Sequence, residues 1–185
     1  MVYDPDKHHR RSLRLRGYEY AQAGAYFVTL CADQRVCLFG DVVDGEMRLS
    51  EAGRIVHEEW LRTEAIRSEV ELDVFQVMPN HFHGIVIITD LVPPNQETPG
   101  VAGAHGRAPL RRAPKSLGSL VAGFKSAVTK NINQMRRTPG RPVWQRNYYE
   151  RVIRNQGELE GIQDYIVGNP AKWQEDAENP KNIRP

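Results

Sequence analysis

Two histidines separated by one apolar residue are the side chains of this chain best suited to binding a metal ion. His81 and His83 flank Phe82 at the start of the apolar run 84–88, GIVII, which predicts a buried β-strand. Because side chains at i and i+2 of a strand project from one face, both imidazoles point one way and Phe82 the other. A dry core seldom suits two imidazoles, whereas a divalent cation binds them readily. The spacing favours a metal site, although two histidines that hydrogen-bond locally would also explain it.

A tyrosine and an asparagine near the C-terminal end form a second candidate pair. Tyr165 and Asn169 lie four residues apart in a segment predicted to be helical, so they share a face one turn apart. Asn169 could then complete a coordination sphere with the histidines, and Tyr165 would lie beside the metal. The alternative is that Tyr165 is a core aromatic residue and Asn169 ends the helix before Pro170. Without the histidines, the alternative is the better interpretation.

Tyr148 and Tyr149 are rivals to Tyr165 as the tyrosine beside the histidines. They lie next to each other in a strand-like segment. Adjacent residues on a strand face opposite ways, so at most one of them could reach a site shared with the histidines.

The elements that must position these residues follow from periodicity and from breaks at glycine and proline. Strands are predicted over 25–32, 72–78, 82–89 and 148–153, a hairpin with an Asp-Gly turn over 38–49, and helices over 50–67, 116–135 and 156–169. Without the hairpin, the order is β-α-β-β-α-β with a trailing helix, which is the ferredoxin-like split βαβ arrangement. We therefore expect an α+β fold: an antiparallel sheet with helices on one face, an added β-hairpin and a C-terminal catalytic helix. The other face of the sheet would be free for a ligand.

The chain is predicted to form one domain over 21–178. It follows a basic arm over 1–20 and precedes a short tail over 179–185. Residues 90–115 are rich in proline and glycine and are interpreted as a flexible insertion rather than a domain boundary.

Positive charge is unevenly distributed although the net charge is only +2. Between Glu97 and Glu150 there is no acidic residue, and a second basic cluster lies near the N-terminus. Such segregation is typical of a surface that binds a polyanion, although a solvated loop and a basic helix explain it about as well. The candidate DNA contacts are Arg10, Arg11, Arg14, Lys115, Lys125, Lys130, Trp144, Arg146, Arg151 and Arg154.

Composition excludes several other classes of protein. The chain is 40% hydrophobic and 26% charged, which is ordinary for a globular protein, and no apolar run approaches the roughly 20 residues of a membrane span. The N-terminus lacks the apolar core of a secretory signal. Cys31 and Cys37 have neither a disulfide pattern nor a common zinc spacing. We expect a cytoplasmic protein, associated with the nucleoid when bound to DNA.

Three motifs together resemble a known family. They are residues 78–84 (MPNHFHG), 143–155 (VWQRNYYERVIRN) and 164–170 (DYIVGNP). In this order and separation they resemble the single-tyrosine HUH transposases, and among them the REP-associated tyrosine transposases, over most of the chain. The resemblance implies that His81 and His83 are metal ligands, that Tyr165 is the nucleophile and that Asn169 supplies a third ligand.

The same resemblance implies a DNA-nicking and joining reaction. A neutral phenol, with a pKa near 10, is a poor nucleophile, so a cation such as Mg²⁺ or Mn²⁺ beside it would assist attack on a phosphodiester. Attack by Tyr165 would release a 3′-hydroxyl and leave a 5′-phosphotyrosine. The expected partner is single-stranded DNA that forms a hairpin, bound by a monomer or homodimer. Two alternatives stay open: a metal-dependent phosphodiesterase that uses water, and a non-catalytic protein that binds DNA hairpins.

Overall fold

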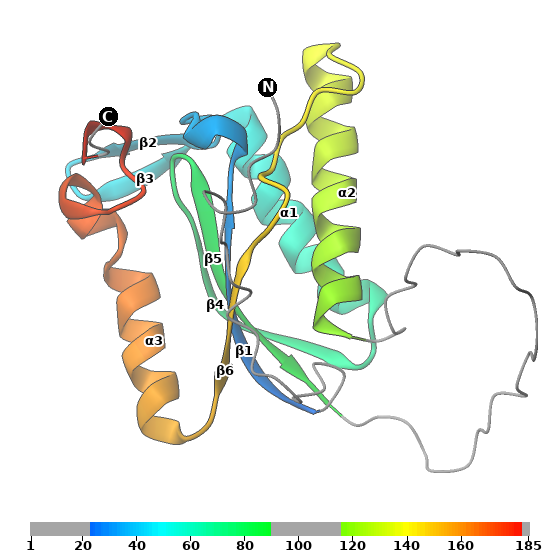
Figure 1. The fold of residues 1–185 in the computed structure, drawn as a ribbon, viewed down its shortest axis with the longest axis vertical. Helices are drawn as coiled ribbons and strands as arrows, with labels where there is room; N and C mark the ends of the chain where they lie inside the picture. Colours follow the sequence, from blue (N-terminus) through cyan, green and yellow to red (C-terminus); the bar gives the residue numbers. More distant parts are fainter. Residues whose placement is uncertain (1–22, 90–115, 183–185) are drawn as a thin grey trace, which may run out of the picture.

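A four-stranded antiparallel sheet is the centre of the molecule (Figure 1). The computed structural model describes residues 23–89 and 116–182. In chain order the elements are β1 (Gly24–Cys31), η1 (Asp33–Arg35), β2 (Gly40–Val43), β3 (Glu46–Leu49), α1 (Glu51–Ile66), β4 (Val70–Val77), β5 (His81–Ile88), α2 (Leu117–Arg136), β6 (Tyr149–Ile153), α3 (Gln156–Gly168), η2 (Pro170–Glu175) and η3 (Pro180–Asn182).

The strands pair in the order β4-β5-β1-β6, and every pairing is antiparallel. The two central strands are therefore β5, which carries both histidines, and β1. The register places Cys31 opposite His81 and Thr29 opposite His83. This sheet, with its helices and hairpin, confirms the predicted α+β fold class.

Local sequence explains why the elements begin and turn where they do. The side chains of Ser50, Ser116 and Asn155 accept hydrogen bonds from backbone N–H groups in the first turns of α1, α2 and α3, as good N-cap residues do. The β2–β3 turn has positive φ at both Asp44 and Gly45, as the predicted Asp-Gly hairpin requires. This hairpin forms a separate two-stranded sheet.

Helices cover both faces of the sheet, so the expectation of one free face is wrong. In Figure 1, α1 and α2 lie on one side and α3 on the other. The α1/α2 face holds the main core, in which Phe82 packs with Trp60 and Phe124. The α3 face holds a small apolar cluster of Phe27, Ile85, Ile153 and Ile166. The free face was expected because the sequence does not show that the last helix folds back across the sheet.

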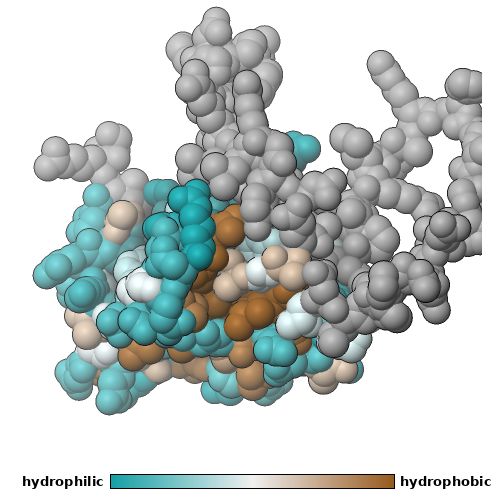
Figure 2. All heavy atoms as spheres, turned by 90° about the horizontal axis from the view of Figure 1, so that it is seen from below, coloured by the Kyte–Doolittle hydropathy of each residue, from teal (hydrophilic) through white to brown (hydrophobic). Residues whose placement is uncertain are grey.

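The apolar residues reach the lower end of the molecule. Seen from below, hydrophobic residues gather in the middle of this face with hydrophilic residues around them (Figure 2).

Among residues 23–89 and 116–182, no helix combines the length and apolar character needed to cross a membrane.

Candidate metal centre and nucleophile

His81 and His83 lie side by side on β5 and face α3. Their rings are 4.6 Å apart between centroids, and at most 3% of either residue is exposed. Phe82, between them, points to the opposite face and packs 4.7 Å from Trp60 between ring centroids. The strand alternation inferred from the sequence is therefore confirmed.

Asn80 determines which nitrogen of His81 carries the proton. The Asn80 amide nitrogen donates to the backbone carbonyls of Arg35 at 3.0 Å and Glu178 at 2.7 Å. Its carbonyl oxygen therefore faces His81 Nδ1, 2.9 Å away, and the ring must donate there. His81 Nε2 is left with a bare lone pair. This atom is buried and has no hydrogen-bond partner in the described part of the chain.

His83 joins the sheet to the proposed nucleophile. Its Nδ1 lies 2.8 Å from the Thr29 hydroxyl on β1, and its Nε2 lies 3.3 Å from the Tyr165 hydroxyl on α3. The His83 and Tyr165 rings meet at an angle, with centroids 5.2 Å apart. The structure thus brings residues 83 and 165 into contact, as the sequence prediction requires.

Asp176 completes a three-residue group that sequence reasoning missed. One ligand atom from each of His81, His83 and Asp176 lies within 4.8 Å of the other two. The Asp176 carboxylate is 3.8 Å from His81 Nε2. It follows η2, in the C-terminal segment that Asn80 and an Arg35–Glu178 ion pair of 2.8 Å hold against the sheet. This group could bind a metal ion, and no spacing in the sequence indicated the carboxylate.

The predicted ligand Asn169 lies at the C-terminal end of α3. It is 3% exposed, and its amide oxygen is buried without a hydrogen-bond partner among the described residues. Burial raises the pKa of the Tyr165 phenol, and the nearby Asn169 side chain opposes that rise. The shared helical face of Tyr165 and Asn169 is therefore present, while the role of Asn169 as a ligand stays a prediction.

Burial sets the protonation of the site. It lowers the pKa of His81 to about 3. Burial, followed by the neighbouring His81, lowers the pKa of His83 to about 3 against the opposing effect of Asp176. Both imidazoles are therefore neutral near pH 7, and the His81–Asp176 contact is not an ion pair. Burial and then the Asp176 charge raise the pKa of Tyr165, so this phenol holds its proton tightly without a cation.

These residues fit a divalent cation. Neutral imidazoles, a carboxylate and an amide oxygen are all metal-ligating groups. Two of the donor atoms, His81 Nε2 and Asn169 Oδ1, are buried without other partners among residues 23–89 and 116–182. Such orphaned atoms are costly unless something binds them. Asn80 and Thr29, bonded to the far nitrogens of the imidazoles, match the outer-shell partners that orient metal-bound histidines.

The rival tyrosines face opposite sides of the sheet, as adjacent strand residues should. Tyr148 packs against the α1/α2 core. Tyr149 is 40% exposed on the other side, where it lines a pocket together with Tyr165. Only Tyr149 therefore shares the histidine-bearing face and remains a structural rival.

Four of the candidate DNA contacts line one groove on the α2 side. Lys125, Lys130, Trp144 and Arg146 border a groove of about 510 Å³. The Lys125 ammonium donates to the backbone carbonyls of Gln145 and Arg146, so it holds this segment as well as lining the groove.

Trp144 is only 6% exposed, because it packs against Phe39 and Phe124 and pairs with Ala32 in an isolated bridge. Its main role in the structure is therefore in the core.

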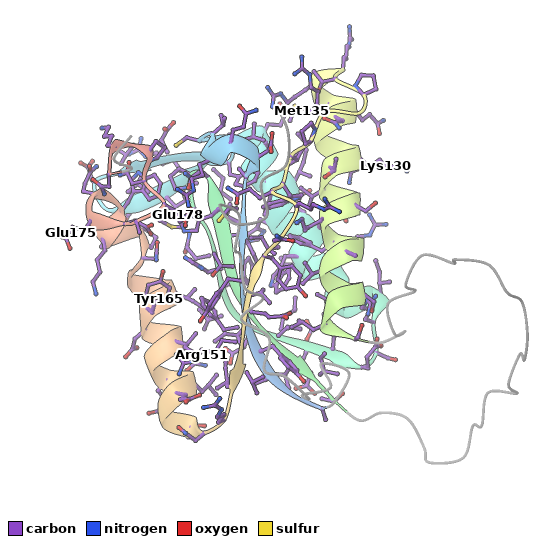
Figure 3. All side chains as sticks on the ribbon, in the orientation of Figure 1. Lys130, Met135, Arg151, Tyr165, Glu175 and Glu178 are labelled. Carbon is purple, nitrogen blue, oxygen red and sulfur yellow. The ribbon has the colours of Figure 1, made fainter. Side chains whose placement is uncertain are left out.

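The remaining candidates are divided between the α3 side and the undescribed parts of the chain. Arg151 lies with Tyr165 on the α3 side, and Lys130 lies across the sheet on α2 (Figure 3). Arg154 is exposed just before α3. Arg10, Arg11, Arg14 and Lys115, with the arm over 1–20 and the whole insertion over 90–115, lie outside the described residues.

Comparison with known proteins gives one close relative and one shared fold. No family model matches the chain. A protein of Haemophilus influenzae described as uncharacterized is 36% identical over 178 residues, which span 94% of this chain and 95% of the relative. The solved structure of a REP-associated tyrosine transposase bound to a REP hairpin superposes with a TM-score of 0.56 and 17% identity, covering 86% of this chain and 74% of that one. The resemblance noted in the sequence is thereby confirmed at the level of the fold.

Proposed function

We propose that this chain, which belongs to one family with the Haemophilus influenzae protein, nicks and joins single-stranded DNA. The proposal starts from its fold, which is that of a REP-associated tyrosine transposase. The observation that carries the proposal is the position of the Tyr165 hydroxyl, 3.3 Å from Nε2 of His83. The same His83 belongs to the group with His81 and Asp176 that could bind a metal ion. Tyr165, the proposed nucleophile, therefore lies in the same site as the candidate metal centre.

Four side chains of the chain would hold the cation. His81, His83 and Asp176 present their donor atoms together, and the orphaned oxygen of Asn169 favours it as a further ligand. When bound there, Mg²⁺ or Mn²⁺ would supply positive charge against the phosphodiester and favour loss of the phenol proton. Thr29 and Asn80 hold the two imidazoles in orientation.

Tyr165 is the proposed nucleophile. Its oxygen forms a bond to phosphorus as the bond from phosphorus to the 3′ oxygen of the neighbouring nucleotide breaks. The phenol loses its proton and the 3′ oxygen gains one, which leaves a 5′-phosphotyrosine and a free 3′-hydroxyl. A second 3′-hydroxyl attacking the phosphotyrosine reverses these changes and joins two strands without ATP. Tyr165 is 48% exposed, so it lies at the surface, where a strand would approach it.

The proposed substrate is a single strand that forms a hairpin. The solved relative in fold is bound to a REP hairpin, and in this chain Lys130 and Arg146 border the groove on the α2 side. These two cationic side chains would neutralise phosphates of a bound strand. Arg151 lies beside Tyr165, where it is paired with Glu158.

A denaturing gel tests the proposal. The full chain is incubated with Mn²⁺ and an end-labelled DNA hairpin that has single-stranded flanks on both sides. A labelled band that migrates with the protein after denaturation is expected from the unaltered chain. The band is expected to disappear in Tyr165→Phe, which keeps the ring, and to persist in Tyr148→Phe and Tyr149→Phe.

Other results would favour the two alternatives. Strand cleavage that survives Tyr165→Phe would overturn the covalent step and indicate hydrolysis by water. Hairpin binding with neither a cleaved nor a covalent product would indicate a non-catalytic DNA-binding protein.

A further inference from the structure

A pocket of about 360 Å³ lies between β1, β6 and α3, directly beside Tyr165. Its walls include Phe27 from β1, Tyr149 and Arg151 from β6, and Gly161 and Tyr165 from α3. This volume falls in the range of small-ligand sites. The metal-ligating side chains do not line it, so the pocket is a neighbour of the candidate metal centre rather than a part of it.

Aromatic rings form much of the wall. Phe27 meets Tyr149 edge-on, with ring centroids 6.1 Å apart, and meets Tyr165 in the same way at 6.2 Å. Both tyrosines are large exposed side chains, at 40% and 48% of their surface. Partly exposed aromatic rings around a pocket are suited to stacking against another flat ring.

The charges at the rim of the pocket are paired. The Arg151 guanidinium lies 3.3 Å from the Glu158 carboxylate, whose other oxygen accepts the backbone N–H of Arg154 at 3.1 Å. An anionic phosphate would meet this carboxylate as well as the guanidinium, so the rim does not favour it. An uncharged ring with polar edges could stack on the tyrosine beside the pocket and could also hydrogen-bond with the Arg151 guanidinium, a donor, and the Glu158 carboxylate, an acceptor.

Two glycines keep the helix side of the pocket open. Gly157 and Gly161 are one turn apart on α3, and both line the pocket. A Cβ at Gly161 would meet nothing within 4 Å. The helix would therefore tolerate a side chain at this position, and that side chain would occupy the pocket.

We propose that this pocket holds the nucleobase of a nucleotide adjacent to the phosphate that Tyr165 attacks. The inference rests on the proposed function and adds to it a site that reads a base, separate from the groups that act on the phosphate. Stacking on Tyr149, with Phe27 as the buried wall of the pocket, would hold the base out of the strand and place the neighbouring phosphate at the Tyr165 hydroxyl.

Binding measurements with and without bases test the pocket separately from the chemistry. The probes are fluorescein-labelled (dT)₁₂, (dA)₁₂ and a 12-residue abasic strand with the same phosphates, titrated by anisotropy with the full chain in EDTA. The unaltered protein is expected to bind at least one base-bearing strand about tenfold more tightly than the abasic strand, because a base stacked on an aromatic side chain strengthens binding by about this factor or more.

Filling the pocket is expected to remove that preference. Gly161→Leu should bind all three strands about equally. Gly123→Leu is the matched control, because it places the same side chain on an exposed position of α2 that also has nothing within 4 Å of its Cβ. Tyr149→Ala should weaken the preference and Tyr149→Phe should keep it.

The outcomes separate the pocket from the proposed reaction. No preference for bases in the unaltered protein, or equal preference in Gly161→Leu and Gly123→Leu, would overturn the pocket. A covalent DNA band together with either of these results would leave the proposed reaction standing. A base preference that Gly161→Leu alone removes supports the pocket, and a missing covalent band would then count against the reaction only.

Discussion

The two faces of the sheet differ in what they bury. The α1/α2 face is packed with aliphatic and aromatic side chains around Phe82 and Trp60. The α3 face buries two neutral imidazoles and an asparagine, with only a small apolar cluster beside them. Burying polar groups costs stability unless each finds a partner, so the α3 face has less apolar packing and more polar atoms that could bind a metal ion. The α1/α2 face holds the main core, and the α3 face holds the candidate metal centre.

The strand β5 contains both roles in three consecutive residues. Phe82 packs into the apolar core, whereas His81 and His83 lie on the opposite face in the candidate metal centre. Substitutions one residue apart should therefore produce different kinds of loss: of folding stability at Phe82 and of metal binding at His81.

The largest effect is expected on the apolar face. Phe82→Ala removes a fully buried ring that contacts Trp60, Phe75 and Phe124. It should lower the free energy of unfolding by about 3–5 kcal/mol in a denaturant titration. The control Ile66→Ala alters a residue that is 69% exposed and should change it by less than about 0.5 kcal/mol. A loss below about 1 kcal/mol in Phe82→Ala would contradict the assignment of this face as the main core.

The neighbouring His81→Ala should affect metal binding more than folding. Removing a ligand should weaken Mn²⁺ binding, measured by calorimetry, by at least about 100-fold, since even outer-shell partners are worth about 10–100-fold. Saturating Mn²⁺ should raise the melting temperature of the unaltered protein but not of the variant. His57→Ala, on α1 and away from the site, is the control. Unchanged Mn²⁺ affinity in His81→Ala would refute the proposed centre.

A smaller effect is expected from the C-terminal carboxylate. Asp176→Asn keeps the shape of the side chain but removes its charge, and should weaken Mn²⁺ binding by about tenfold. Asp164→Asn is a matched control, because Asp164 is exposed on α3. If both variants bind Mn²⁺ equally well, Asp176 is a neighbour of the site rather than a ligand.

The smallest effect concerns how α3 is held over the polar face. The Gln163 amide donates to both carboxylate oxygens of Asp73 on β4, at 3.1 and 2.9 Å. Gln163→Ala should lower the free energy of unfolding by about 1 kcal/mol. Gln156→Ala loses only a bond within the helix to Glu160 and should cost about 0.3 kcal/mol. Equal losses in the two variants would show that the link to β4 does not stabilise the helix.

Most of the fold could be predicted from the sequence, because the patterns that indicate each element are local. Alternation along β5 placed the histidines on one face, the Asp-Gly pair marked the hairpin, and a four-residue spacing placed Tyr165 and Asn169 on one side of α3. Each of these rests on backbone geometry within a single element.

The residues that sequence reasoning missed depend on contacts between distant segments. Asp176 follows a 3-10 turn that has no periodicity to interpret, and contacts of Glu178 with Asn80 and Arg35 hold its segment at the site. Trp144 was predicted, with neighbouring basic residues, to contact DNA. The structure buries most of it in the core because its segment runs beside Ala32, and it also lines the α2-side groove. Its contact with DNA stays a prediction.

Peptide mapping of the DNA-linked protein tests the central claim most directly. The covalent product formed with Mn²⁺ and the labelled hairpin would be digested with nuclease and protease, and the residue that carries the remaining nucleotide would be identified by mass spectrometry. We predict a phosphodiester link to Tyr165. A nucleotide on Tyr149, which shares the same face of the sheet, or on any other residue would contradict it.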